Sequence, residues 1–273
     1  MHVSINQSDF PRKVLVATLG LAPQVLTETL WHLAVRQNPP FLPDEIHIIT
    51  TREGAHRARL TLADDENGAL ERLSRDWNLP DLMAALQKGG IHIIEGETGP
   101  LEDIDSEADN RAAADLVTSL VRQLAGDPHA ALHVSIAGGR KTMGFLLGYA
   151  LSLFGRSQDR LSHILVSAPF QDHPDFYFPP KHPIVLRDRN GRPASTADAQ
   201  ILLAEIPVVH LRPHLPKHLL SGAASYTQTV MAAQTALSTP EMRLVAAKTK
   251  LVCAGIDVQL APQAFAFAAW LAR

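Results

Sequence analysis

The sequence predicts an α/β fold in which a parallel sheet is covered by helices on both faces. Short apolar runs alternate with amphipathic helical patterns through the first 170 residues. This alternation is typical of parallel sheets, because a helix usually joins each strand to the next. With 273 residues, 46% hydrophobic and 19% charged, the chain is also long enough for one large domain and a smaller one.

Five strands and the helices between them follow in order from these patterns. The apolar runs predict strands at 13–19, 45–50, 91–94, 131–136 and 161–167. Helical patterns begin at Pro23, which suits a first helical turn, and recur at 57–62, 69–77, after Pro80, and at 106–125 and 142–154. Ser106 is the expected N-cap of the long helix 106–125. The core of the first domain is therefore placed at 13–170.

Beyond residue 168 the sequence becomes rich in proline and histidine. The pair Asn190-Gly191 lies between apolar segments 185–186 and 199–203, which indicates a hairpin on the sheet edge. We therefore predict a first domain over 1–205, with the edge hairpin at 184–205. The remaining segment, 206–273, is expected to hold a connector at 208–220, a helix at 223–237, two short strands around Gly255 within 243–260, and a last helix at 262–273.

Composition limits the classes of function. The net charge of −3 and the pI of about 6.5 exclude a surface that coats nucleic acid, so a nucleotide would be held in a local site. The single cysteine, Cys253, excludes an internal disulfide and a cysteine-based zinc cluster, and it fits a reducing cytoplasm. Because we find no apolar run of about 18 residues and no signal peptide, a membrane role is not expected.

The most informative motif is VSIAGGRKTM at 134–143, where an apolar strand ends in two glycines and two adjacent cations. Glycines let a ligand approach the backbone closely, and the start of the following helix offers unpaired N–H groups. Arg140 and Lys141 add full positive charges. With Ser135 just before the glycines, this arrangement favours a phosphate site over a plain strand-to-helix turn with solvated charges.

A second loop, at 18–24, follows the first predicted strand. In an open parallel sheet, ligands bind beyond the carboxyl ends of the strands where the strand order reverses, and both loops meet that description. Neither loop has the G-x-G-x-x-G or G-x-x-x-x-G-K-[ST] pattern, since Gly20 is a lone glycine and Lys141 follows Gly-Gly-Arg directly. These absences count against an NAD dehydrogenase and an ATPase.

Together, ATLGLAPQVLTETLWHL near the start and HVSIAGGRKTMGFLLGYALSLFG in mid-chain resemble the CRISPR-associated Rossmann-fold (CARF) sensor family, and more narrowly its ring-nuclease branch in type III systems. The resemblance covers 13–170 and implies a Rossmann-like fold. It also implies a homodimer whose loops surround a cyclic oligoadenylate, expected to be cyclic tetra-adenylate, and cut it to end antiviral signalling. The ligand-binding residues expected on this basis are Thr18, Leu19, Gly20, Gln24, Ser135, Gly138, Gly139, Arg140, Lys141 and Thr142.

The chemistry of RNA agrees with this expectation. The ribose 2′-OH is a built-in nucleophile, so cleavage to a 2′,3′-cyclic phosphate needs in-line geometry and charge stabilisation, with neither metal nor cofactor. Lys141 is assigned as the cation that stabilises the transition state and Arg140 as a positioning cation. Thr18 either orients the 2′-OH or ends its strand with an ordinary hydrogen bond. Arg52 either reaches a phosphate or is a surface charge at a helix start.

A metal site is not expected among the histidines. His210, His214 and His218 recur every four residues, as ligands on one helix would. Pro213 and Pro216 lie between them and prevent a regular helix there.

The segment 243–273 resembles the opening of a winged-helix module. Such a module needs a recognition helix further on, so DNA binding is expected only if the module is completed beyond Arg273. Otherwise the segment serves for packing and dimerisation. Two other functions stay open: a non-catalytic CARF sensor that regulates DNA binding or a partner effector, and an ordinary nucleotide-binding metabolic enzyme.

Overall fold

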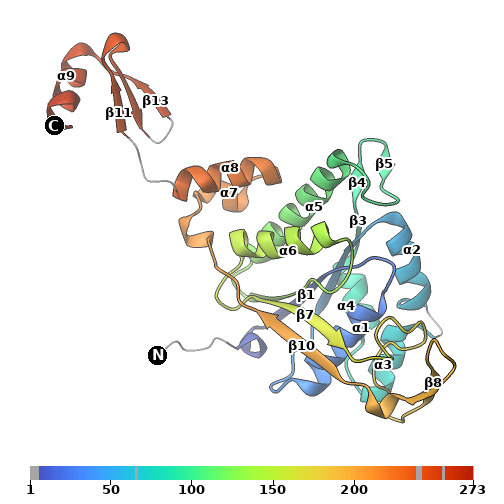
Figure 1. Ribbon diagram of the computed structural model, residues 1–273. Helices are drawn as coiled ribbons and strands as arrows, with labels where there is room; N and C mark the ends of the chain where they lie inside the picture. Colours follow the sequence, from blue (N-terminus) through green and yellow to red (C-terminus); the bar gives the residue numbers. More distant parts are fainter. Residues whose placement is uncertain (1–5, 65–66, 238–241, 254–255, 273) are drawn as a thin grey trace. The chain divides into compact units, whose positions relative to one another are not determined.

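The computed structural model describes residues 6–64, 67–237, 242–253 and 256–272 (Figure 1). It divides into two compact units, Met1–Arg212 and Pro213–Arg273, which we treat separately. The sequence places this boundary at residue 205. Besides the helices and strands given below, short 3-10 helices cover Gln7–Asp9, Thr196–Asp198, Arg212–His214 and Ala246–Lys248.

The first unit is built on a six-stranded sheet in the order β10-β7-β6-β1-β2-β3. Five of its strands are parallel, as predicted: β1 (Arg12–Thr18), β2 (Glu45–Thr50), β3 (Gly90–Ile93), β6 (Ala130–Ser135) and β7 (Arg160–Val166). The sixth, β10 (Ile201–Ile206), pairs antiparallel with β7 at the edge. The α/β fold class predicted from the alternation of strands and helices is therefore confirmed.

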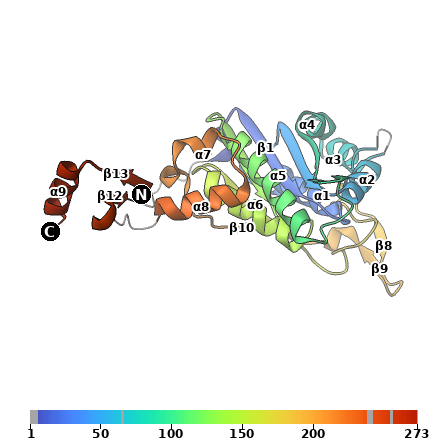
Figure 2. The ribbon, with the colours of Figure 1, turned by 90° about the horizontal axis from the view of Figure 1, so that it is seen from above.

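Helices cover both faces of this sheet (Figures 1 and 2). One face carries α1 (Gln24–Trp31), extended by a π-helical turn at His32–Arg36, with α3 (Ala69–Trp77) and α4 (Leu82–Gly89). The other face carries α5 (Glu107–Ala125) and α6 (Lys141–Phe154). Ser106 caps α5 as predicted, since its hydroxyl accepts a hydrogen bond from the backbone N–H of Asp109 at 3.1 Å. The helix α2 (Arg52–Thr61) begins five residues before the predicted segment, because Thr51 caps it.

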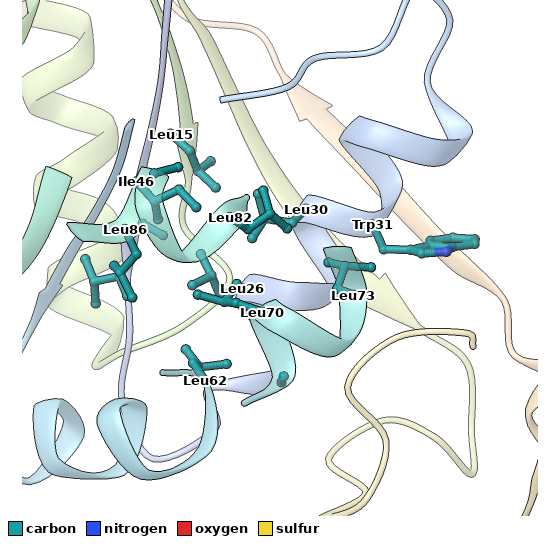
Figure 3. Close-up of a cluster of buried hydrophobic side chains, with 14 of the residues drawn as sticks. Leu15, Leu26, Leu30, Trp31, Ile46, Leu62, Leu70, Leu73, Leu82 and Leu86 are labelled. Atoms are coloured by element: carbon teal, nitrogen blue, oxygen red, sulfur yellow. The ribbon is translucent and has the colours of Figure 1, made fainter. Parts of the chain in front are cut away.

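A leucine-rich core fixes the position of β1 against the first face (Figure 3). Leu15 of β1 and Ile46 of β2 are fully buried against Leu26 and Leu30 of α1 and against leucines of α3 and α4. Each buried leucine contributes about 1.5–3 kcal/mol to the free energy of unfolding. This packing holds the carboxyl end of β1 rigid.

The strand order locates a crevice at the carboxyl ends of β1 and β6. These two strands are neighbours, but the chain leaves β1 toward α1 on one face and leaves β6 toward α6 on the other (Figure 2). Such a reversal of strand order is where open α/β sheets bind ligands. Both loops singled out in the sequence begin at this point.

The predicted edge hairpin is wrong in its second strand. Asn190-Gly191 joins β8 (Val185–Arg187) to β9 (Pro193–Ser195), while Ile201–Ile206 pairs with β7 instead. The Asp188 carboxylate accepts hydrogen bonds from the backbone N–H groups of Asn190 and Arg192, both at 2.8 Å. The turn therefore closes on the nearest residues and leaves β10 to cover the open edge of β7. A second small hairpin, β4 (Glu95–Gly96) with β5 (Gly99–Pro100), was not predicted.

The second unit has mixed α and β structure, as expected. It contains α7 (Lys217–Ser221), α8 (Tyr226–Leu237) and α9 (Pro262–Leu271). Its antiparallel sheet has three strands, β11 (Met242–Val245), β12 (Lys250–Cys253) and β13 (Ile256–Gln259), where two were predicted around Gly255. Gly255 itself lies outside the described residues. Within the described parts of the chain, none of the helices combines the length and apolar character that a membrane span requires.

Candidate functional site

The two loops at the carboxyl ends of β1 and β6 meet at a tight backbone junction. The hydroxyl of Thr18 donates a hydrogen bond to the carbonyl oxygen of Gly138 at 2.7 Å. A Cβ added at Gly138 would lie 2.6 Å from the carbonyl oxygen of Thr18, and one at Gly20 would lie 3.2 Å from the Cα of Gly139. Gly139 also has φ of +83°, a conformation that L side chains rarely adopt. The glycines are therefore required for the loops to form one surface.

Two hydroxyls predicted at the site lie beneath this surface. Thr18 is fully buried, and its bond to Gly138 ties the loops together. The sequence left two roles open for Thr18, and the geometry favours the one in which its hydroxyl ends the strand with an ordinary hydrogen bond. Ser135 is also buried, and its Oγ lies 3.4 Å from the Oγ1 of Thr29 in α1. Both hydroxyls therefore support the loops from below.

The start of α6 presents N–H groups and charge. Arg140 is the N-cap residue and makes no side-chain capping bond, so the first N–H groups of the helix have no cap from this residue. Lys141 and Thr142 are exposed at this end. Among the described residues, the ammonium group of Lys141 makes no ion pair or side-chain hydrogen bond. A positive helix terminus and an uncompensated lysine therefore lie side by side.

The other two predicted cations are paired with acids that follow β5. The Nε of Arg140 donates to Oδ1 of Asp103 at 2.9 Å, and a second contact joins its Nη2 to Oδ2. This hydrogen-bonded pair raises the pKa of Arg140 and lowers that of Asp103. Arg52 is exposed and forms an ion pair with Glu102. Sequence patterns gave no signal for Glu102 and Asp103, because the pairs join segments far apart in the chain.

A hollow of about 260 Å³ lies on the β2 side of the loop junction. We call it the β2-side hollow; it is lined by Leu19, Gly20, Leu21, Thr51, Glu53, Glu102, Asp103, Gly139, Arg140 and Met143. It therefore combines backbone from both loops with one cation and three acids.

A second hollow, of about 130 Å³, lies on the β7 side of the same junction. This β7-side hollow is lined by Ala22, Gln24, Val25, Glu28, Ala137, His163, Ile164, Leu165, Val166, Gln171 and Asp172. Glu28 is only 3% exposed, and burial, followed by the nearby Asp172 charge, raises its pKa to about 8. Glu28 was missed in the sequence. The signal that could have found it was an acid in the first helix, one turn after Gln24 and between Leu26 and Leu30 of its apolar face.

No metal-ligand cluster emerges from the described residues. In those parts of the chain, no group of three or more His, Cys, Asp and Glu side chains is placed to hold an ion. His214 ends a 3-10 helix and His218 lies in α7, so the spaced histidines do not share one regular helix.

Comparisons with known proteins identify the family of this chain. A family model described as CRISPR-associated protein NE0113 (Cas_NE0113) matches residues 22–239, which include Gln24 and the Gly-Gly-Arg-Lys loop. A solved structure of Enterococcus italicus Csm6 bound to cyclic hexa-2′-fluoro-hexa-dAMP is similar at 16% identity and a TM-score of 0.34. That match covers 58% of this chain and 34% of the Csm6 chain, so this chain spans about a third of its length. No curated protein matches the chain.

Proposed function

Since this chain belongs to the family of CRISPR-associated NE0113 proteins, we propose that it binds a cyclic oligoadenylate, cyclic tetra-adenylate first, and cleaves it without a metal. One observation carries the proposal: two glycine loops meet at the strand-order reversal, beside a helix start whose Lys141 has no ion pair with any described residue. The likeness of both loops to the CARF ring nucleases supports the nature of the ligand.

The ligand phosphates lie over Gly138–Lys141 in this proposal. The N–H groups at the start of α6 and the Lys141 ammonium attract a phosphodiester, which needs no base sequence to be recognised. Arg140 joins them by exchanging its Asp103 partner for phosphate oxygens. Because that ion pair is exposed, the exchange costs little.

A second copy of the chain completes the site. A ring with repeated phosphates is matched best by two identical sets of loops, and two-fold pairing is the commonest way to supply them. Leu21 in the first loop and Phe145 in α6 are 53% and 66% exposed, and Phe145 stacks on Tyr149 with ring centroids 5.9 Å apart. These apolar side chains beside the site suit a contact between protomers. Sedimentation should give a dimer with one ring bound per two chains, and one ring per monomer would contradict the shared site.

Cleavage proceeds from the substrate's own hydroxyl. The ribose 2′-oxygen attacks the adjacent phosphorus, and the bond from phosphorus to the 5′-oxygen breaks. The 2′-OH proton passes to solvent, and the leaving 5′-oxygen takes up a proton. The products are a 2′,3′-cyclic phosphate and a 5′-OH. The loops hold the phosphate in line with the 2′-oxygen, and Lys141 stabilises the negative charge that builds up on the phosphorane.

The test is incubation of the protein with cyclic tetra- and hexa-adenylate in EDTA, followed by chromatography of the products. We expect linear products that end in 2′,3′-cyclic phosphate. Rings with 2′-deoxy or 2′-fluoro ribose should bind but stay uncut, because the phosphate contacts remain while the nucleophile is lost. Two results would overturn this mechanism: hydrolysis of the deoxy ring, or loss of cleavage of the ribose-containing rings in EDTA.

A sensor without nuclease activity is the second candidate. The observation that favours it is the pairing of Arg140 and Arg52 with acids, which leaves Lys141 to carry the charge at the loops. A sensor would bind the 2′-OH ring and its 2′-fluoro analogue equally well and would release both intact. The same chromatography therefore separates the two candidates.

A further inference from the structure

The β7-side hollow borders the two loops, and among the described residues its lining includes His163 but neither lysine nor arginine. Ala22 and Gln24 come from the first loop and the start of α1, and Ala137 directly precedes Gly138. A nucleotide whose phosphate lies on Gly138–Lys141 therefore has its sugar and base beside this hollow. Gln171 and Asp172, which are exposed, also line it, so a ligand can enter from solvent. Its volume is below the roughly 300–1,000 Å³ of sites for whole drug-sized ligands, which suits one part of a ligand.

Two residues that line the hollow have polar side-chain atoms without hydrogen-bond partners in the described part of the chain. The Glu28 side chain lines it, is 97% buried, and makes no hydrogen bond or ion pair within the described residues. The Oε1 of Gln24 is buried and, in the same parts of the chain, also has no hydrogen-bond partner. The two residues are four apart on α1 and so share one face of the helix. Buried polar groups without partners are costly, and a ligand that hydrogen-bonds both removes that cost.

We propose that the β7-side hollow receives an adenine base of the bound ligand, and that the Glu28 carboxyl group reads the N1 and N6 edge of that base. This inference rests on the proposed function and adds to it the means of base selection. Val25, Ile164 and Val166 supply apolar walls for the faces of the ring, while Gln24 lies near Glu28 to accept a second N6 hydrogen.

The protonation of Glu28 fits adenine. Adenine presents an N–H donor at N6 beside an acceptor at N1. A neutral carboxyl group has the complementary pair, because its O–H donates to N1 while its carbonyl oxygen accepts from N6. Burial and the Asp172 charge, which raise the pKa of Glu28 to about 8, keep that proton in place at neutral pH. Purine lacks the N6 amino group and keeps only the N1 acceptor, so it forms one hydrogen bond with this carboxyl group where adenine forms two.

The experiment compares 2′-fluoro cyclic tetra-adenylate with the same 2′-fluoro ring carrying purine in place of adenine, neither of which offers the 2′-OH nucleophile. Calorimetry with the wild-type chain should show a preference of about tenfold for the adenylate ring, close to the value of one hydrogen bond. Glu28→Gln keeps a donor beside an acceptor and should keep the preference. Glu28→Leu has neither, and its preference should fall to about twofold or less. Thermal unfolding checks that both variants are folded.

The outcomes separate this inference from the function on which it rests. If the wild-type chain binds both rings equally, or if Glu28→Leu keeps the full preference, the hollow does not read adenine, while ring binding itself stands. If the wild-type chain binds neither ring, both proposals fail. The comparison of the two rings on the wild-type chain decides the inference even if a variant does not fold.

Discussion

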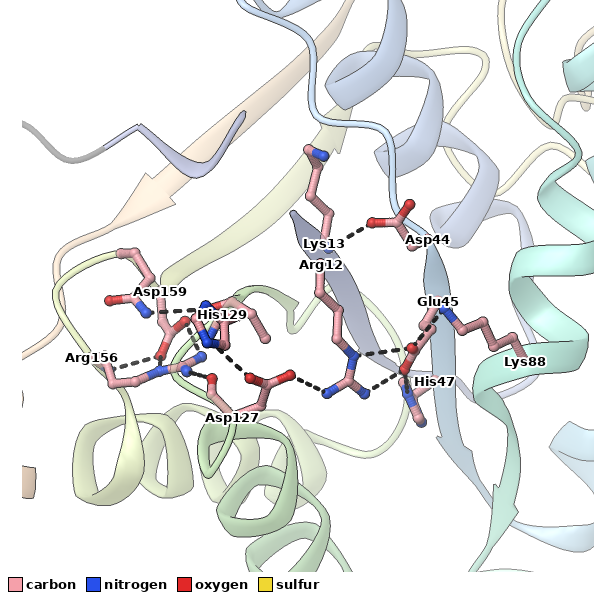
Figure 4. A network of polar contacts seen from close by, with 12 residues as sticks. Arg12, Lys13, Asp44, Glu45, His47, Lys88, Asp127, His129, Arg156 and Asp159 are labelled. Carbon is pink, nitrogen blue, oxygen red and sulfur yellow. Dashed lines mark hydrogen bonds and ion pairs between the residues drawn. The ribbon is translucent and has the colours of Figure 1, made fainter. Parts of the chain in front are cut away.

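The two ends of the same parallel sheet treat their buried glutamates in opposite ways. At the amino ends of the strands, Glu45 accepts hydrogen bonds from the Nε and Nη2 of Arg12 at 3.0 and 2.7 Å, and lies 3.1 Å from the Nζ of Lys88 (Figure 4). The same Arg12 donates to Asp127 at 3.0 Å. At the carboxyl ends, Lys141 lacks an ion-pair partner among the described residues and Glu28 is buried in a hollow.

The two glutamates show what this difference means. Arg12 above all lowers the pKa of Glu45 to about 2, so its charge is part of the folded structure. Burial raises the pKa of Glu28 to about 8, so the folded structure holds this side chain in its protonated, neutral form. A buried acid that loses its cation partner destabilises a fold, so a paired acid such as Glu45 serves the structure. A buried acid without a cation partner reduces stability, and such groups with shifted pKa values are found where a ligand makes use of them. We therefore expect substitution of Arg12, at the amino ends, to change the free energy of unfolding. Substitution of Lys141 or Asp103, at the carboxyl ends, should change cleavage or ligand binding.

The largest effect is expected from Lys141→Ala. Its loss removes the cation that meets the phosphorane, so single-turnover cleavage of cyclic tetra-adenylate should slow at least tenfold, and on the order of 10²–10³-fold. The free energy of unfolding should stay the same, because the side chain is exposed. Lys248→Ala, which removes another exposed lysine in the second unit, is the matched control and should cleave at the wild-type rate. Unchanged cleavage by Lys141→Ala would remove this residue from the mechanism.

A pH series sharpens the contrast between the glutamates. Glu28 takes up a proton on folding, so its favourable contribution is complete below pH 4.5, its ordinary pKa, and is lost as the pH rises to about 8. The wild-type chain should therefore lose stability relative to Glu28→Gln across this window, by on the order of 3 kcal/mol in total. Glu45 works in the other direction, since its contribution is complete above pH 4.5 and is lost as the pH falls toward 2.

Urea unfolding of both chains at pH 5, 6, 7 and 8 measures the Glu28 effect, because all other titrating groups cancel in the difference. A difference in stability that does not vary with pH would mean that Glu28 is ionised in the folded protein.

Arg12→Ala should affect stability without affecting the site. Of the described partners of the Glu45 carboxylate, which is 7% exposed, it leaves Lys88 and His47. We expect a loss of about 2–3 kcal/mol in the free energy of unfolding, below the value for fully buried pairs because Arg12 is 31% exposed. Arg111→Ala breaks an exposed pair with Glu107 and should cost less than about 0.5 kcal/mol. Slower cleavage by folded Arg12→Ala would mean that the two ends are coupled.

The amino-acid sequence was sufficient for the parts of this molecule that depend on local pattern. The apolar runs located the five parallel strands, and the glycines with Arg140 and Lys141 located the second loop. A parallel sheet then brings that loop to the same edge as Thr18 without further information.

The remaining features depend on contacts between distant segments. Asp103 reaches Arg140 across 37 residues, and no periodicity predicts such a pair. The second strand assigned to the hairpin was wrong because the pairing of β10 with β7 is likewise non-local. Glu28 was missed because a helical pattern shows which residues share a face, but not that a hollow opens against one of them.

The smallest effect, and the last test of the comparison, is Asp103→Asn. This change removes a negative charge from the β2-side hollow and frees Arg140 for phosphate, so 2′-fluoro cyclic tetra-adenylate should bind about threefold more tightly, in keeping with an exposed ion pair. Glu102→Gln, which frees Arg52 in the same way, is the matched control: it tightens binding only if Arg52 also reaches a phosphate. Weaker binding by Asp103→Asn would show that Asp103 holds Arg140 in its binding position. The carboxyl end would then resemble the amino end, with its charges already arranged by the protein.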